Sequence, residues 1–428
     1  MALLRPPYTS AVSDGPNGTA AAEDALARGD LASAEELGRA ALRDGESLAA
    51  RLTLAQALAW QGRGRDADAV MSEVDDSRLS ESDLMAWALP QAANQFWMLD
   101  QPERATAFLR TVRTKVTSDG AGATLDALLG TFAMNAGSPE RAMQIARDVL
   151  ASPNADQQAI GWAASAAALC HARMGRFADV DDLAARAIAA GHPGLLRFTS
   201  AFGQTTALIM SGELDRAQAL ADGLVDGSRA TQPSHAIARL LVADVLIARG
   251  QCAESVEILE SVTAALAPTG YSWGPLAWML LAHSLGQLGR VADAGRMLAK
   301  AESRHGLKSM LFAPELSLAR AWTAAARHDG PGAINAARES ARAAERGGQS
   351  AVALRALLDA VRLGDTRAAD AIERLGVDCV VGDMALNYAR ALTAGDAAAL
   401  DAAGEAFAGI GMHGVAADAA KQAATARG

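Results

Sequence analysis

The amino-acid sequence predicts an all-α protein, folded as a right-handed α-solenoid of about eleven helical hairpins. Aromatic residues make up 4% of the 428 residues while alanine is abundant, a composition that suits close helix packing better than a broad sheet. Apolar residues recur at helical spacing, and a glycine or aspartate turn interrupts them at a regular interval. Length alone would suggest several domains, but a repeat of this kind predicts one continuous array.

The segment from Met134 to Leu150 shows the unit that repeats. Gly137 can adopt the positive φ that ends a helix, the Ser138 hydroxyl can cap the next helix, and Pro139 suits the first helical position. The apolar residues that follow lie at i, i+3, i+4, i+7 and i+8 and share one helix face: Ala142, Ile145, Ala146, Val149 and Leu150. This apolar stripe needs a neighbouring helix to cover it.

The same turn recurs at intervals of roughly 31 to 39 residues. The turn positions are Gly29, Gly64, Asp100, Gly137, Gly175, Gly212, Gly250, Gly289, His328, Gly364 and Gly395. In most copies a small residue follows five positions later: Ala34, Ala69, Ala105, Ala142, Ala217, Ser255, Ala294, Ala333 and Ala369. Two helices per period are typical of tetratricopeptide-like (TPR-like) repeats, in which each hairpin buries its stripe against the next. We expect a disordered lead over residues 1–18 and one continuous solenoid over residues 19–428.

Large apolar residues concentrate on the first helix of each hairpin: Trp60, Trp97, Trp162, Phe202, Trp278 and Trp322. First helices usually line the concave surface of a solenoid, although aromatic residues on apolar stripes are more often part of the core. Loops at 226–234, 267–275 and 376–383 interrupt the repeat. The second loop either exposes its two aromatic residues to a partner or folds them back over the solenoid edge. The candidate partner-binding residues are Tyr271, Trp273, Trp97, Trp162 and Trp278.

The sequence contains none of the common motifs of a catalytic or metal site. It has no GxxxxGK[ST] phosphate loop, no HExxH and no GxSxG. Cys170 and His171 are adjacent, so on a helix they diverge by about 100° and cannot hold one metal without other donors. We therefore expect no enzymatic activity, no cofactor, and no catalytic, cofactor-binding or metal-binding residues.

The charge and the cysteines indicate a class of protein and a compartment. The net charge of −10 opposes binding to the phosphates of nucleic acid. Cys170, Cys252 and Cys379 lie far apart and form no disulfide framework, and no apolar run approaches the roughly 20 residues of a membrane span. We expect a cytoplasmic protein that binds a protein or a small effector on its concave face, with no direct nucleic-acid binding and no membrane contact.

The last part of the chain resembles a known family. The segment from Ala402 to Ala426 is similar to the last helical repeat of the large LuxR-type transcriptional regulators of actinobacteria, the group related to the maltose regulator MalT. In that family the repeat has the form (E)xFxxxGxxxxAADAAxQAA. The matching residues are Phe407, Gly411, the run Ala416–Ala420, and Gln422 with the two alanines after it. The rest of the chain is similar to the family only in its architecture.

The resemblance implies a function for the repeat region. Family members carry a nucleotide-binding module before the repeats and a helix-turn-helix after them, and this sequence shows neither. The expected function is that of a non-catalytic arm that senses an effector or partner for a LuxR-type regulator. The alternative is an independent TPR-like scaffold or adaptor. An α/α-toroid enzyme is a further alternative, which the low aromatic content disfavours. No site residues are carried over, because the functional motifs of the family lie in the missing modules.

Overall fold

The computed structural model describes residues 17–45, 47–191, 195–228 and 233–428, and these residues form 23 α-helices and no strand. Helices α1 to α22 form eleven consecutive pairs, and α23 closes the array. The first helices of the pairs are α1 (Asn17–Arg28), α3 (Leu48–Trp60), α5 (Glu81–Ala93), α7 (Asp119–Asn135), α9 (Gln157–Arg173), α11 (Leu196–Met210), α13 (Ser234–Arg249), α15 (Trp273–Gln287), α17 (Ala313–Ala326), α19 (Ser350–Arg362) and α21 (Val380–Ala394). The predicted all-α solenoid is therefore confirmed.

The second helices of the pairs are shorter on average and carry the amphipathic stripes. They are α2 (Leu31–Asp44), α4 (Gly64–Ser72), α6 (Pro102–Arg113), α8 (Pro139–Ala151), α10 (Val180–Ala189), α12 (Leu214–Asp226), α14 (Cys252–Leu266), α16 (Val291–Arg304), α18 (Gly330–Arg346), α20 (Ala369–Leu375) and α22 (Ala397–Gly409), and α23 spans His413–Arg427. Helix α1 begins at Asn17, so the end of the expected lead is helical, while residues 1–16 lie outside the described residues.

Left-handed backbone marks the turns that the sequence predicts. All the predicted turn residues except Gly64 have a positive φ. Asp100 (φ 54°) and His328 (φ 62°) are the non-glycine residues with this conformation in the described chain, which non-glycine residues adopt uncommonly. In the second hairpin Gly62 takes the turn conformation (φ 79°), and Gly64 instead begins helix α4. The repeat thus imposes the same turn even where glycine is absent.

The segment from Met134 to Leu150 agrees with the prediction except at its cap. Gly137 has φ 80° and Pro139 is the first residue of α8. Ser138 is the N-cap residue, but its hydroxyl accepts no hydrogen bond from the helix. Its own N–H donates to the carbonyl of Ala133 (2.9 Å), so the backbone closes this turn, and water can reach the first turn of α8 because Ser138 is exposed. The expectation of a serine side-chain cap is therefore wrong.

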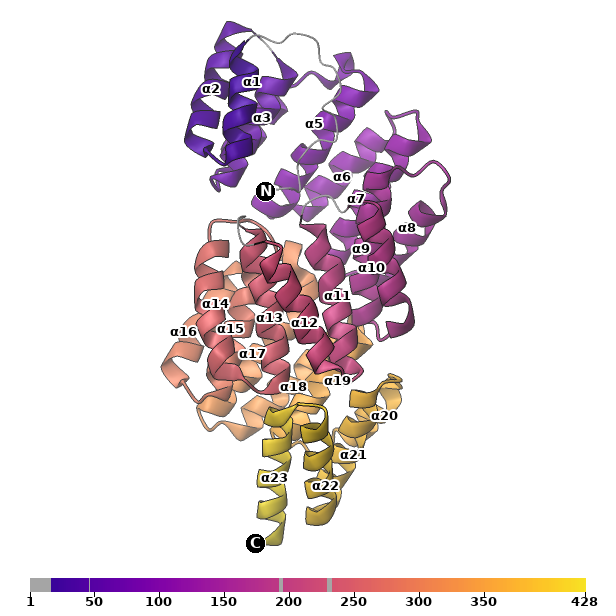
Figure 1. The fold of residues 1–428 in the computed structure, drawn as a ribbon, viewed down its shortest axis with the longest axis vertical. Coiled ribbons are helices and arrows are strands. Elements are labelled where there is room, and N and C mark those ends of the chain that lie inside the picture. The colour runs from indigo at the N-terminus through magenta and orange to yellow at the C-terminus, as the bar shows by residue number, and fades with distance from the viewer. Residues whose placement is uncertain (1–16, 46, 192–194, 229–232) are drawn as a thin grey trace.

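The hairpins wind into a superhelix in which later hairpins lie against earlier ones. Figure 1 shows the chain passing from α1–α3 across α5–α9 and returning below them through α12–α16. At Gly137 an added Cβ would lie 3.1 Å from the Cβ of Met310, and at Gly250 it would collide with the backbone of Gly414. These two glycines permit both the positive φ and the close approach of a distant part of the chain. The turn residues therefore also serve contacts between superhelical turns.

Polar groups bridge the superhelical turns as well. Lys308 lies in the 3-10 segment η4 (Leu307–Phe312), and its Nζ donates to the carbonyl oxygen of Trp97 (2.5 Å), 211 residues away. The N–H of Lys308 donates to a carboxylate oxygen of Asp100 (3.1 Å). Asp100 thus takes part both in the left-handed turn before α6 and in the bridge to η4.

Candidate ligand-binding pocket

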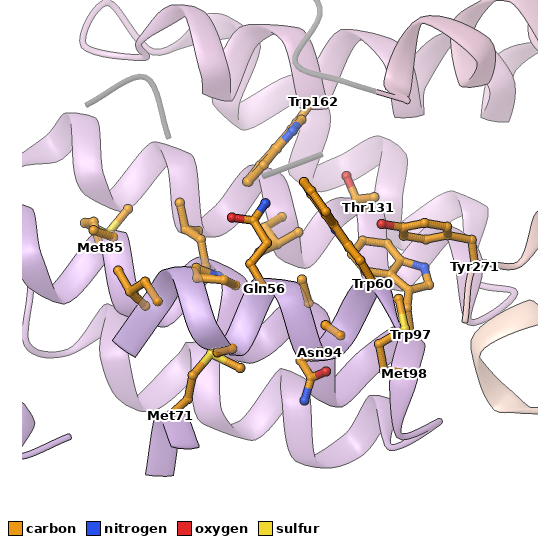
Figure 2. Close-up of a pocket in the computed structure, with 18 of the residues that line it drawn as sticks. Gln56, Trp60, Met71, Met85, Asn94, Trp97, Met98, Thr131, Trp162 and Tyr271 are labelled. Atoms are coloured by element: carbon orange, nitrogen blue, oxygen red, sulfur yellow. The ribbon is translucent and has the colours of Figure 1, made fainter. Parts of the chain in front are cut away.

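A hollow opens between the first helices of four successive hairpins, α3, α5, α7 and α9. It is closed at one side by Tyr271 from the loop between α14 and α15 (Figure 2). The cavity volume is about 100 Å³, and the space measures about 1120 Å³ when the part open to solvent is counted. The lining residues are Leu52, Ala55, Gln56, Ala59, Trp60, Met71, Met85, Ala86, Leu89, Pro90, Ala93, Asn94, Trp97, Met98, Leu128, Thr131, Gln158, Trp162, Leu196 and Tyr271.

A local irregularity of α5 shapes the floor of this pocket. Pro90 lies inside the helix and has no N–H to donate, and the chain continues after Ala93 as a π-helical turn, η2 (Asn94–Met98). The N–H of Leu99 accordingly donates to the carbonyl of Asn94, five residues earlier (3.0 Å). The wider turn changes the direction in which the side chains project. Asn94, Trp97 and Met98 all line the pocket.

Ring contacts hold Trp97 in place. Its indole meets Phe132 edge to face (5.3 Å between centroids) and Tyr271 at 6.2 Å, while Phe96 stacks on Phe132 at 4.2 Å. Such pairs contribute about 0.5–1.5 kcal/mol each beyond the area they bury. Figure 2 shows Trp97 and Tyr271 at one end of the pocket, with Met71 and Met85 toward the other. One end is therefore held by aromatic rings, and the other is lined by flexible thioethers.

Of the described residues that line the pocket, none carries a charged side chain, and their polar groups are neutral. Asn94 donates through Nδ2 to the carbonyl of Gly64 (2.9 Å), while its Oδ1 is buried and has no hydrogen-bond partner in the described chain. The indole Nε1 of Trp162 is likewise buried without a partner there. Burial raises the pKa of Tyr271 to about 12, so its phenol stays protonated at neutral pH. The pocket thus offers an apolar surface with a few neutral hydrogen-bonding groups.

The candidate residues that the sequence indicates lie mostly around this region. Tyr271, Trp97 and Trp162 line the pocket, and Tyr271 and Trp97 also line an adjoining smaller cavity together with Trp273. Trp278 lines neither cavity, because its ring is buried in α15 beneath the Lys300 ammonium, 4.6 Å away. Their role in partner binding remains a prediction.

The loop that carries Tyr271 and Trp273 is not an exposed arm. Both side chains are half-buried and pack against the main hydrophobic core. The ring of Trp273 lies 5.8 Å from that of Phe202 and 6.4 Å from that of Phe312. The segment therefore folds its two aromatic residues back onto the solenoid, although they pack against the core and not over the solenoid edge that the sequence suggested.

Sequence reasoning did not find several residues of the pocket. Met71, Met85 and Met98 resemble ordinary core residues in the sequence, and nothing in their spacing distinguishes them. The one available signal was Pro90 inside an otherwise helical stretch, followed closely by the aromatic pair Phe96 and Trp97. An interior proline indicates a helix irregularity, and such irregularities often occur near binding sites.

Where the end of α9 meets the later hairpins, the interior is charged instead of neutral. The guanidinium of Arg173 at the end of α9 pairs with the Glu315 carboxylate (2.8 Å) and donates to the side-chain oxygen of Gln349 (2.5 Å) and to the carbonyl of Leu311 (2.9 Å). It also lies 5.3 Å from the ring centroid of Phe312. Only 2% of the Arg173 side chain is exposed. A buried cation is therefore compensated by groups that lie 138 to 176 residues later in the chain.

Further ion pairs continue this charged region. Asp244 of α13 pairs with Arg355 of α19 (3.2 Å). Arg362, at the end of α19, pairs with Asp359 (2.7 Å) and with Asp418 of α23 (2.8 Å). These pairs connect hairpins that are distant in sequence, and the small cavity between them is lined by both Asp244 and Arg355. We interpret this region as a structural contact between superhelical turns.

The described residues hold no group of three or more histidine, cysteine or acidic side chains that could bind a metal ion. Cys170 and Cys252 are buried free thiols, and burial raises their pKa to about 12 and about 11. Among the helices that the structure describes, none combines the length and the apolarity needed to cross a bilayer.

Comparison with known proteins shows the fold. No family model matches the sequence, and no curated protein is similar to it. A solved structure of a Rap protein complexed with competence and sporulation factor is 13% identical, with 81% of this chain and 99% of that chain covered and a TM-score of 0.54. A tetratricopeptide repeat protein from Parabacteroides merdae is 15% identical, with 71% of this chain and 97% of that chain covered and a TM-score of 0.40. The chain has a TPR-like helical-repeat fold.

Proposed function

We propose that this chain is a non-catalytic binding protein whose effector occupies the pocket between α3, α5, α7 and α9, and that it is the sensing arm of a LuxR-type transcriptional regulator. The observation that supports binding there is the pocket itself: an apolar hollow with a few neutral polar groups among its described lining residues. Small-molecule sites in proteins usually have this composition.

The position of the pocket suggests how binding would be sensed. Tyr271 comes from a later superhelical turn than the helices that form the floor, and its ring lies against Trp97. The carbonyl of Trp97 in turn accepts the hydrogen bond from Lys308. A ligand that touches both Trp97 and Tyr271 would favour one arrangement of the two turns, and an effector acts by such differential binding.

Two features bear on the link to transcription. The family-like residues near the end of the sequence lie in and between the last two helices, α22 and α23, where Phe407, Ala419 and Ala423 are fully buried. They therefore have a packing role of the kind expected for a terminal helical repeat. In the resembling family this repeat lies beside the DNA-binding module, and we propose that this chain acts on such a module.

The proposal is tested by capture of a small molecule from an extract. The immobilised full chain is incubated with extract of the cells that make it, washed, and analysed by native mass spectrometry. We expect a stoichiometric small-molecule adduct on the natural chain and a much weaker one on Ala93→Phe, because the phenyl ring would occupy the hollow beside half-buried Ala93. Ala207→Phe, at a half-buried alanine of α11 away from this pocket, is the matched control.

The outcome separates the two functions considered. If the natural chain and Ala93→Phe captured the same amount of a protein and neither carried a small molecule, the sensor function would be wrong and the scaffold function would be favoured. The link to transcription is examined by introducing Ala93→Phe into the native cells and sequencing their RNA. An unchanged transcript profile in the presence of a captured effector would contradict it. The isolated chain is expected to hydrolyse no ATP and to show no retention on duplex DNA.

A further inference from the structure

We infer that the ligand of this pocket is a neutral small molecule with a largely aromatic or polycyclic body and only one or two polar groups. This inference rests on the proposed function, because it specifies the class of molecule that the same pocket would bind. It is carried by three properties of the lining: the absence of charge, the kind of apolar side chains, and the two unpartnered polar atoms.

The charge of the described lining disfavours anionic and cationic ligands. Among the described residues that line the pocket, none carries a charged side chain. A carboxylate, phosphate or ammonium group that entered would lose its hydration and find no opposite charge, and such uncompensated burial is strongly unfavourable. The chain does compensate buried charge elsewhere, as at Arg173 and Glu315 (2.8 Å), so the neutral lining is a property of this site.

The apolar side chains favour a flat, ring-containing ligand. Trp60, Trp97, Trp162 and Tyr271 present aromatic faces and edges from four different elements. Aromatic rings pack against other rings in stacked or edge-to-face arrangements, which adds to the free energy of burial. Three methionines, Met71, Met85 and Met98, form much of the remaining wall, and flexible thioethers adapt to an irregular ring system.

The unpartnered atoms indicate where a few polar groups of the ligand would bind. The Trp162 Nε1 can only donate and the Asn94 Oδ1 can only accept, and both are buried without a partner in the described chain. Figure 2 shows the Tyr271 hydroxyl turned into the hollow, where it can donate or accept. Both atoms have almost no accessible surface, so a ligand carbonyl or hydroxyl would reach one of them through a side-chain movement, and it would then remove the cost of an unsatisfied buried group. A peptide backbone carries more polar groups than these residues can satisfy.

The inference is tested with two fluorescent probes that share one ring skeleton. N-phenyl-1-naphthylamine is neutral, and 8-anilino-1-naphthalenesulfonate carries a sulfonate on the same framework. Each is titrated into the purified full chain while probe emission and tryptophan quenching are recorded. We expect the neutral probe to bind one site at least about tenfold more tightly than the anion. Ala93→Phe should weaken the neutral probe about tenfold or more, and Ala207→Phe should leave its affinity unchanged.

Each outcome decides the inference separately from the proposed function. If the sulfonate binds as tightly as the neutral probe and both are displaced by Ala93→Phe, the neutral class is wrong and the pocket remains a binding site. If neither probe shows binding that depends on residue 93, the neutral class is also wrong, and capture from extract then decides the proposed function. If Ala93→Phe loses its helical circular dichroism, Ala86→Phe takes its place, because Ala86 lines the same hollow about two turns earlier in α5.

Discussion

The pocket between α3 and α9 and the charged interior that joins the end of α9 to α13, α17 and α19 are built from the same helical hairpins, yet their contents are opposite. The first region is neutral and open, with the buried polar atoms of Asn94 and Trp162 unpartnered. The second is closed by ion pairs such as Arg173 with Glu315 and Asp244 with Arg355. The repeat therefore determines the backbone, while the inner-face side chains decide whether a region can accept a ligand or is joined to another part of the chain.

The difference also explains why a charged interior does not by itself indicate a binding site. The guanidinium of Arg173 already has a carboxylate, an amide oxygen and a backbone carbonyl as partners. A ligand would have to break these contacts before it could form its own. In the pocket a ligand would meet mainly apolar side chains, and no described ion pair among the lining residues would have to be broken.

The largest effect is expected from loss of a buried ion pair in the second region. Arg173→Ala leaves the largely buried Glu315 carboxylate without its cationic partner. Removal of one partner of a buried ion pair lowers the free energy of unfolding by about 3–5 kcal/mol. Urea denaturation followed by circular dichroism measures the change in the free energy of unfolding. Arg110→Ala removes an exposed arginine of α6 and serves as the control. Equal midpoints for the two variants would show that the ion-pair region does not join the superhelical turns.

An effect of similar or smaller size is expected from acid. Burial lowers the pKa of His283 from 6.5 to about 4, so below pH 6.5 the unfolded state binds the proton more readily than the folded state. The stability that His283 contributes is present above pH 6.5 and is lost as the pH falls toward 4, by up to about 3 kcal/mol. Urea midpoints at a series of pH values should fall over this window, and less steeply for His283→Gln.

The same titration sharpens the comparison between the regions. The neutral probe should keep its affinity from pH 8 to pH 5.5 in the folded chain, because Tyr271 is the one titratable residue among the described residues that line the pocket, and its pKa is about 12. If the affinity for the neutral probe fell over the same pH range as the free energy of unfolding, the pocket and the charged interior would not behave independently. If the stability of His283→Gln and of the natural chain depended on pH in the same way, His283 would not be the cause of the loss of stability in acid.

A smaller effect, equal in both parts of the array, is expected at the helix crossings. Ala142 in α8 and Ala217 in α12 are 1% and 0% exposed. A tryptophan at either position overpacks the hairpin at a cost of about 1–3 kcal/mol and should lower the Tm by several degrees. Ala151→Trp, at the exposed end of α8, should leave the Tm almost unchanged. A tolerated tryptophan at Ala142 or Ala217 would remove that position from the common packing scheme.

The sequence predicted the repeat closely because the repeat is local. Asp100 and His328 were assigned as turns from their register, and both have the left-handed backbone. The register failed at Gly62 and Gly64, where two glycines lie close together and only one could be the turn. The prediction of a side-chain cap also failed at Ser138. The hydroxyl makes no capping hydrogen bond, and the turn is closed by the backbone N–H of Ser138.

By itself the sequence determined the helices, their pairing and the turns between them, since each of these depends on residues within one period of the repeat. Only the tertiary structure decided which inner-face residues meet. The pocket brings Leu52 together with Tyr271, and Lys308 reaches Trp97 across 211 residues. Such meetings depend on small rotations that add up from one hairpin to the next, and these rotations arise from packing along the whole array. The repeat therefore allows the fold to be predicted from the sequence, but the position of the candidate pocket depends on how the superhelix winds.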